Sequence, residues 1–123
     1  MPKFSRQSEE KLRTCRIELQ TVLREAIKHC DFTVVCGFRD QDEQNKAVEE
    51  GRSQLAWPNS NHNTWPSYAV DVAPYPINWK DEKEFYYLAG MILGIASQLG
   101  IRLKWGGRWK TLVDLPHFEI YRD

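Results

Sequence analysis

The sequence predicts a small α+β domain in which helices pack on one face of a mainly antiparallel sheet. Two segments repeat apolar residues at three- and four-residue spacing, which is typical of amphipathic helices, and a third has a helix-capping residue at its start. Four short apolar runs, rich in β-branched and aromatic residues, are typical of strands. The chain has 123 residues, which suits one domain but leaves too few complete βα units for a doubly wound parallel sheet.

The first half contains two expected helices and one expected strand. Residues 5–29 have a charged face and an apolar face, so we expect one long amphipathic helix there. His29 lies near its end, where a cation favours the helix dipole, and we interpret it as structural. Residues 32–38 form a β-branched apolar run that predicts a buried strand. Asp40 is a suitable N-cap for a second helix over residues 41–50.

The second half begins with a polar loop over residues 52–68, and a loop of this length inside a compact domain is usually functional. Strands are expected at residues 68–73, 101–105 and 117–121, with a third helix over residues 81–99. The inner face of that helix should carry Phe85, Ala89, Ile92, Ala96 and Leu99.

Charge and hydropathy exclude several classes. The 17 basic and 17 acidic residues give no net charge, so there is no basic excess for a nucleic-acid partner. No stretch approaches the ~20 apolar residues of a membrane span, and the N-terminus opens no apolar signal sequence. We therefore expect synthesis in the cytoplasm. The three cysteines, Cys15, Cys30 and Cys36, form no paired motif and are expected to be small buried residues.

Two histidines and one carboxylate carry the chemical signal. Asp71 lies between Val70 and Val72 in an apolar strand, where a carboxylate is costly to bury unless it is paired or binds a metal. His62 lies in the loop before this strand, and His117 begins the last strand. Two imidazoles and one carboxylate are a sufficient zinc shell when a fourth position stays open for water.

A hydrolytic zinc site also needs a general base, which takes the proton from water. Asp114 lies three residues before His117, on an expected turn. Glu119 is a rival base, because it shares one side of a strand with His117. We prefer Asp114 and expect Glu119 to support the ligands through hydrogen bonds. Cys36 is a further candidate ligand, and a metal-free arrangement of hydrogen-bonded side chains is also open.

Four motifs in order carry a resemblance to a known family. They are Ser60-Asn61-His62, Ala69-Val70-Asp71, Trp105-Gly106-Gly107 and Asp114-Leu115-Pro116-His117-Phe118-Glu119. Together they resemble the zinc D-Ala-D-Ala carboxypeptidases, a family that includes vancomycin-resistance D,D-peptidases and phage L-alanyl-D-glutamate endopeptidases. The resemblance covers residues 34–121 and is closest to the short phage endolysins. It implies the α+β fold of D,D-peptidases and hedgehog-like domains.

The resemblance implies a role for each matching residue. His62, Asp71 and His117 correspond to the ligands of one zinc ion, and Asp114 corresponds to the catalytic base. Arg39 corresponds to an arginine that contacts the substrate and stabilises the oxyanion, which suits a guanidinium. The alternative for Arg39 is a surface ion pair with Asp40 or Asp42. Ser60 and Trp105 are expected to contact substrate, and Glu119 to support the metal ligands.

The implied activity is zinc-dependent hydrolysis of the L-Ala–D-Glu bond in the peptidoglycan stem, in host lysis by a bacteriophage. The alternatives are a D-Ala-D-Ala carboxypeptidase and a non-catalytic module that binds cell-wall peptide on the same fold. Residues 1–123 are expected to form a single zinc peptidase domain without a separate wall-binding domain. We expect a monomer that has no stable membrane association and acts in the periplasm after a holin opens the membrane.

Two departures from the family bear on specificity. The family commonly places its Asp seven residues after the first His, with a glycine between them. Here the separation is nine, and Trp65-Pro66-Ser67 occupies the gap, as in some phage members. Arg108 follows Trp-Gly-Gly where phage enzymes usually carry an Asp, and this reversal of charge is expected to affect substrate preference.

Overall fold

The sheet contains four antiparallel strands in the order β1-β2-β4-β3, in a computed structural model that describes residues 2–122. The strands are β1 (Phe32–Cys36), β2 (Ala69–Pro74), β3 (Leu103–Trp105) and β4 (His117–Ile120). The helices are α1 (Arg6–Leu12), α2 (Ile17–Ala26), α3 (Gln41–Glu49) and α4 (Glu82–Gln98). Two short 3₁₀ turns, η1 (Asn61–Asn63) and η2 (Gly106–Arg108), complete the fold. The predicted α+β class is therefore confirmed.

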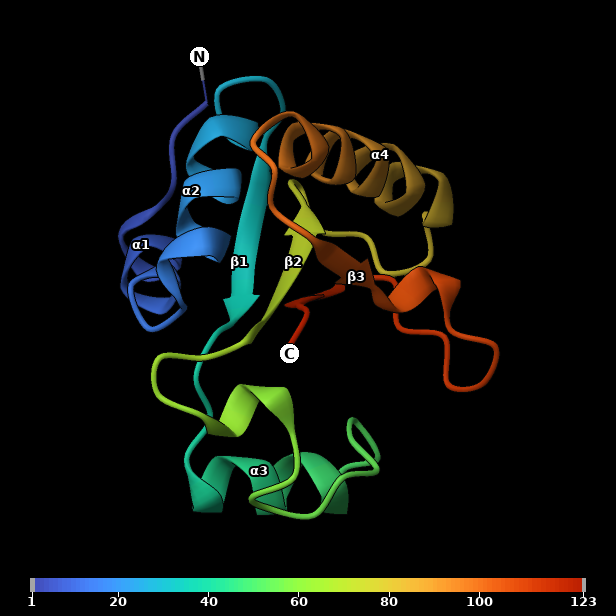
Figure 1. The fold of residues 1–123 in the computed structure, drawn as a ribbon. Helices are drawn as coiled ribbons and strands as arrows, with labels where there is room; N and C mark the ends of the chain where they lie inside the picture. Colours follow the sequence, from blue (N-terminus) through green and yellow to red (C-terminus); the bar gives the residue numbers. More distant parts are fainter. Residues whose placement is uncertain (1, 123) are drawn as a thin grey trace.

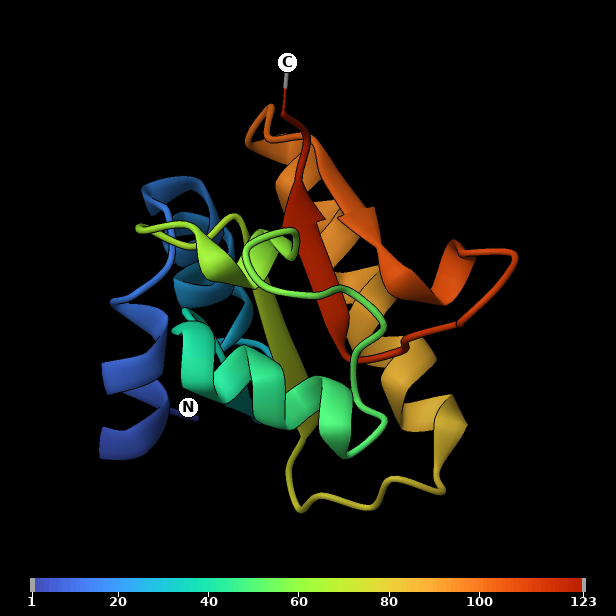
Figure 2. The ribbon, with the colours of Figure 1, turned by 90° about the horizontal axis from the view of Figure 1, so that it is seen from below.

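Three helices form one layer against the sheet. Helices α1, α2 and α4 lie beside the sheet (Figure 1). All three contribute side chains to the core that covers this face. Helix α3 lies apart from this layer, beyond the end of β1 and near the start of β2 (Figures 1 and 2). The chain between α3 and β2 returns to the sheet through η1. This arrangement leaves the end of the sheet near α3 free of the helical layer.

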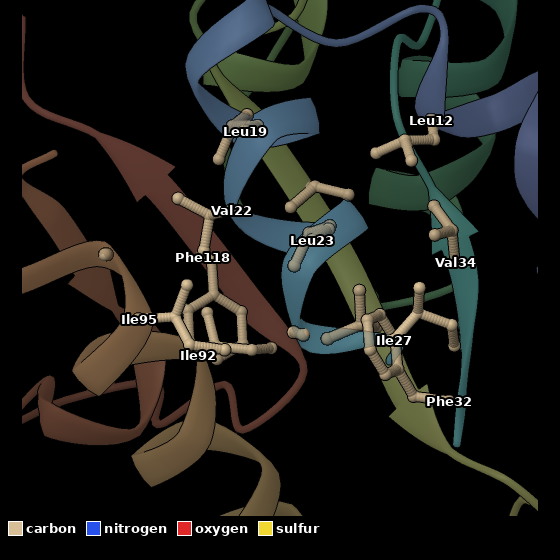
Figure 3. Close-up of a cluster of buried hydrophobic side chains, with 14 of the residues drawn as sticks. Leu12, Leu19, Val22, Leu23, Ile27, Phe32, Val34, Ile92, Ile95 and Phe118 are labelled. Atoms are coloured by element: carbon tan, nitrogen blue, oxygen red, sulfur yellow. The ribbon is translucent and has the colours of Figure 1, made fainter. Parts of the chain in front are cut away.

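The core between sheet and helices is mainly apolar. Leu19, Leu23 and Ile92 are buried from the helix side, and Val34 and Phe118 are buried from the strands (Figure 3). Burial of such side chains contributes about 1.5–3 kcal/mol each to folding. Helix α4 turns Leu88 and Ile95 inward. Leu99, which the sequence placed on the inner face, is 47% exposed, so this prediction was wrong.

The long helix predicted over residues 5–29 was wrong, because the chain breaks between α1 and α2. Ser67 N donates to Thr14 O at 2.8 Å, and Arg16 N donates to Ser67 O at 2.9 Å. Pairing with the segment before β2 therefore replaces a helical turn. Leu12, at the end of α1, and Cys15, within the break, are both buried, so the apolar period gives no sign of the break.

The remaining elements lie close to their expected bounds. Asp40 caps α3, with its carboxylate accepting from Glu43 N and the Glu43 side chain accepting from Asp40 N. His29 contacts Glu25 at the surface at 2.9 Å, as a structural residue should. No helix within residues 2–122 has the length and apolarity that crossing a membrane requires.

Candidate active site

Strand pairing brings the first candidate residues together. In the β2–β4 register, Asp71 lies directly opposite His117. On its other side, Asp71 faces Cys36 across a register shift in β1 between Val34 and Cys36. Such bulges re-aim side chains and occur often next to active sites. Asp71 is therefore held between two strands, with its side chain 15% exposed.

His62 reaches the same place from the η1 turn. Ser60 caps this turn, and its hydroxyl accepts a hydrogen bond from His62 N at 3.1 Å. The His62 backbone oxygen accepts from Arg39 N at 2.8 Å. The ring Nδ1 lies 2.7 Å from Gly37 O, to which it must donate, because a carbonyl only accepts. This contact fixes the ring and leaves Nε2 directed at Asp71.

His117 is fixed from the opposite side by Glu119. Its Nε2 lies 2.7 Å from Glu119 Oε1, while its Nδ1 lies 3.1 Å from Asp71 Oδ1. The second oxygen of Glu119 accepts from Asn61 Nδ2 at 2.8 Å. Both oxygens of Glu119 are thus engaged, and the side chain is only 12% exposed. These contacts match the supporting role predicted for Glu119 and disfavour it as the base.

The three predicted ligands meet at one carboxylate oxygen. His62 Nε2 lies 3.3 Å and His117 Nδ1 lies 3.1 Å from Asp71 Oδ1. Within residues 2–122, two sets of three side chains bring their potential metal-binding atoms within 4.8 Å of one another. One is Cys36, His62 and Asp71, and the other is Asp71, Asp114 and His117. The three predicted ligands are not a group of their own; Asp71 belongs to both groups and joins the two imidazoles.

One atom of this cluster has no hydrogen-bond partner. His62 Nε2 is buried and forms no hydrogen bond with any described residue, although Asp71 Oδ1 is near. Buried polar atoms normally have partners, so an exception requires an explanation. A metal ion would satisfy this nitrogen together with His117 Nδ1 and the Asp71 carboxylate, a donor set that suits zinc. Cys36 lies 3.8 Å from Nδ1, the ring atom already bonded to Gly37.

Asp71 favours the protonated form of both imidazoles. Burial lowers the pKa of His62, but the Asp71 charge outweighs burial and raises this pKa to about 10. Burial also lowers the pKa of His117, while hydrogen bonds to Asp71 and Glu119 raise it to about 9. Burial raises the pKa of Asp71, yet the His62 charge holds it well below its usual range. Two imidazolium ions around one carboxylate carry the positive charge of one divalent cation.

Asp114 lies beside this cluster with its carboxylate accessible. Its Oδ2 is 3.9 Å from His117 Nδ1, and its side chain is 39% exposed. Burial, followed by the charge of Asp71, raises the pKa of Asp114 above its usual value. A raised pKa suits a general base, because it brings proton affinity closer to the working pH.

Arg39 is buried at the cluster and does not form the alternative surface ion pair with Asp40 or Asp42. Its Nη2 lies 3.3 Å from Asp71 Oδ2, and its side chain is 10% exposed. Its Nη1 donates to Gln44 Oε1 at 3.1 Å. The guanidinium therefore lies between a predicted metal ligand and α3.

A cleft of about 660 Å³ opens over these residues. Arg39, His62, Asp114 and His117 all line it, together with Ser60. Further lining comes from residues 51–55 and 111–113. A second groove, about 540 Å³, follows the outer face of α4 and contains none of the predicted site residues. Of these two cavities, only the larger cleft opens onto the cluster.

Trp105, predicted as a substrate contact, is not among the residues that line this cleft. Its indole Nε1 donates to Leu115 O at 2.8 Å, and its ring stacks on Phe118. These contacts support the loop that carries Asp114, and the tryptophan that lines the cleft is Trp109. Arg108 is exposed and also lies outside the lining.

Sequence reasoning gave no role to Asn61, Gln44 or the Gly37 carbonyl, although each contacts a predicted site residue. Asn61 lay within a recognised motif, which was an available signal. Gln44 is a polar residue one helical turn before the buried Ala47, on the inner face of α3, which was a weaker one. Nothing local marked the Gly37 carbonyl, because its contact with His62 depends on the tertiary fold.

Gly106 permits the close approach of the two loops at the cluster. A Cβ at this position would overlap the backbone oxygen of Asp114 and lie 3.1 Å from His117 Cβ. Gly106→Ala should therefore lower the free energy of unfolding by about 1–3 kcal/mol, the usual cost of overpacking. Gly94→Ala is the control, because a Cβ there meets nothing within 4 Å, and it should be neutral or stabilising. Urea unfolding of both variants tests this; equal stability would contradict it.

Comparison with known proteins gives three findings. A family model described as phage L-alanyl-D-glutamate peptidase matches residues 1–122. The chain is 36% identical over 126 residues to the L-alanyl-D-glutamate peptidase of Escherichia phage T5, covering 98% of this chain and 90% of that protein. The crystal structure of Serratia marcescens L-Ala D-Glu endopeptidase ChiX matches with a TM-score of 0.81 and 33% identity, over 97% of this chain and 90% of that one.

Proposed function

Because the chain belongs to the phage L-alanyl-D-glutamate peptidase family, we propose that it hydrolyses the L-Ala–D-Glu bond of peptidoglycan stem peptides as a zinc enzyme. The proposed ligands are His62 Nε2, His117 Nδ1 and the carboxylate of Asp71. The observation that carries the metal assignment is the buried His62 nitrogen, which has no hydrogen-bond partner among the described residues and is directed at the carboxylate that His117 also contacts.

The proposed chemistry divides between the ion and the chain. Bound zinc would make water acidic enough to attack an amide near neutral pH and would polarise the amide carbonyl. Asp114 takes the proton of the attacking water and returns it to the leaving amine. Arg39, which lines the cleft, stabilises the negative charge that develops on the carbonyl oxygen. Glu119 holds the proton on Nε2 of His117, so that Nδ1 is available to the metal.

Ser60 contributes to this site through its backbone contacts and its place in the cleft. Its hydroxyl accepts from His62 N, so it orients the turn that carries a proposed ligand. It also lines the cleft, which supports the proposed contact with substrate.

The proposed setting is host lysis. The protein acts as a monomeric endolysin on the cell wall in the periplasm, after synthesis in the host cytoplasm and passage through a membrane opened by a holin. Its partner is the peptidoglycan stem peptide. Neutral net charge is consistent with a substrate other than nucleic acid.

Mass spectrometry of purified peptidoglycan after digestion tests the proposed bond. Cleavage should release fragments with new D-Glu amino termini and leave L-Ala on the glycan strand. Release of free D-Ala would instead identify a carboxypeptidase. Binding to stem peptides without any new amino termini would identify a non-catalytic module.

Zinc binding at pH 7 should release about two protons, because only an unprotonated imidazole nitrogen binds a metal. The pKa values of His62, about 10, and His117, about 9, leave both rings protonated at this pH. The apparent zinc affinity should therefore rise with pH towards those values. Calorimetric titration in buffers of different ionisation enthalpy counts the protons. A count near zero would contradict these two ligands.

A further inference from the structure

Gln44 is an enclosed polar side chain whose contacts extend into the cleft. It lies on α3 with no exposed surface. Its Oε1 accepts from Arg39 Nη1 and from Asn63 Nδ2, both at 3.1 Å. Its Nε2 donates to Ser53 Oγ at 2.9 Å and to Leu55 O at 2.7 Å. A side-chain amide has two acceptor sites and two N–H donors, so its capacity is fully used.

The partners of Gln44 permit only one orientation of its amide. A guanidinium only donates, so the amide oxygen must face Arg39. A backbone carbonyl only accepts, so the amide nitrogen must face Leu55. An amide in the opposite orientation would leave unpaired groups in a buried position, which costs about 1–3 kcal/mol each.

These contacts join three separate parts of the site. Arg39 is the proposed oxyanion contact. Asn63 belongs to η1, the turn that carries His62, and its side chain also accepts from Ser60 N. Ser53 and Leu55 belong to the lining segment 51–55, and Leu55 is 51% exposed.

The contact with Gln44 helps to fix Arg39, whose long side chain is otherwise held mainly by Asp71. Fixing a flexible arginine costs conformational entropy, which the surrounding contacts must offset. Asp71 holds Nη2, Cys36 Sγ lies 3.3 Å from Nε, and Gln44 holds Nη1. The guanidinium is thus fixed along three directions, and only the Gln44 contact links it to the cleft segment 51–55.

We propose that Gln44 is a positioning residue that orients Arg39 through its amide oxygen and holds segment 51–55 through its amide nitrogen. The two ends of the amide then have separable effects on catalysis. Orientation of Arg39 affects kcat, because the developing charge appears in the transition state. The position of segment 51–55 affects KM, because that segment lines the cleft where substrate binds. This inference rests on the proposed function of Arg39.

Two substitutions of Gln44 separate these effects. Gln44→Met keeps the length of the side chain but removes all four hydrogen bonds, so kcat should fall and KM should rise, each by about tenfold. Gln44→Glu keeps both acceptor contacts and loses both donors. It should restore kcat to within about threefold of wild type while KM stays raised.

Two further variants test the contact between Gln44 and segment 51–55 and control for the loss of a glutamine from α3. Ser53→Ala removes one partner of the amide nitrogen from a partly exposed loop, and it should raise KM by about threefold with kcat unchanged. Gln41→Met changes the same residue type at an exposed position of the same helix, and it should match wild type. Steady-state cleavage of a defined muropeptide gives kcat and KM. Circular dichroism and bound zinc establish that each variant is folded and loaded.

The outcomes separate this inference from the proposed function. If wild-type protein does not cut the L-Ala–D-Glu bond, the proposed function fails, whatever the variants do. If wild type cuts it and Gln44→Met is equally active, only the role of Gln44 is overturned. A Gln44→Glu variant that loses kcat as Gln44→Met does would also overturn it. If Gln44→Met does not fold, Gln44→Glu and Ser53→Ala still decide, since each retains part of the network.

Discussion

Replacing Asp114 by Asn should lower kcat for stem-peptide cleavage by about 10²–10⁴-fold, the contribution of one well-placed general base. The amide has nearly the size of the carboxylate but cannot accept a proton from water. Zinc content and stability should stay near wild type, because the Asp114 carboxylate is 39% exposed and its closest charged partner among the described residues, His117, is 3.9 Å away. Loss of a weak, exposed contact of this kind costs about 0–1 kcal/mol.

Two other variants distinguish Asp114 from Glu119 as the general base and control for the loss of a carboxylate. Glu119→Gln removes the rival base and should weaken zinc binding by about 10–100-fold, because Glu119 orients His117. Asp42→Asn, on the exposed face of α3, is the control for loss of one carboxylate and should retain full activity. A zinc-loaded Asp114→Asn enzyme with wild-type kcat, beside a zinc-loaded Glu119→Gln enzyme that is inactive, would assign the base to Glu119.

The sequence predicted the fold where a local signal determines the structure. Asp40 and the residues after it contain a complete N-capping box, so α3 begins at the expected position. The break between α1 and α2 had no such signal. It arises from the pairing of Thr14 and Arg16 with Ser67, which lies about fifty residues away in the chain. A contact of that kind is invisible to any window of apolar periodicity.

The candidate site was predictable in its residue types and less so in its contacts. The strand position of Asp71, with His62 in the loop before that strand and His117 at the start of the last strand, indicated the three proposed ligands. The family resemblance implied the same three residues. The hydrogen-bond partners could not be predicted, because they depend on how separate elements meet. Gln44 and Gly37 are examples. Gln44 contacts Asn63 of η1 only when α3 packs against that turn, and the Gly37 carbonyl contacts His62 only when η1 packs against the chain that follows β1.

Replacing Asp71 by Asn should abolish tight zinc binding and destabilise the metal-free protein by about 3 kcal/mol at pH 7, the scale of a broken buried ion pair. Asp71 is the one acidic partner of Arg39 among the described residues, at 3.3 Å, and both side chains are largely buried. An amide of the same size leaves the guanidinium charge uncompensated. Asp81→Asn is the control, because Asp81 is exposed and its side chain makes no capping bond.

The Asp71 carboxylate also determines how the stability of the metal-free protein depends on pH. In wild type, burial lowers the pKa of both imidazoles. Asp71 nevertheless raises the pKa of His62 to about 10, and Asp71 together with Glu119 raises that of His117 to about 9. Their unfolded pKa is about 6.5. A raised folded pKa stabilises the protein fully below about pH 6.5, and this stabilisation is lost as the pH rises through the folded values. Metal-free wild type should therefore become less stable between about pH 6.5 and 10.

Asp71 itself acts in the opposite direction at acid pH. Its pKa is raised by burial but lowered further by the charge of His62, so the net shift is downward. A lowered folded pKa stabilises the protein above the unfolded value of about 3.9, and this contribution is lost as the pH falls through the folded pKa. The Asp71→Asn variant loses both contributions of Asp71 and keeps only the hydrogen bond from Glu119 to His117. Its stability should therefore vary less than that of wild type between about pH 6.5 and 10, and its deficit relative to wild type should shrink at both extremes.

Urea unfolding of chelator-treated protein across this pH range measures both curves. A parallel decline of the two proteins above pH 7 would show that Asp71 does not hold the protons on His62 and His117. Equilibrium dialysis with zinc supplies the second measurement, independent of stability. An Asp71→Asn variant that binds zinc as tightly as wild type would place the metal elsewhere. A variant that loses zinc but keeps the wild-type pH profile would separate the ligand role of Asp71 from its electrostatic role.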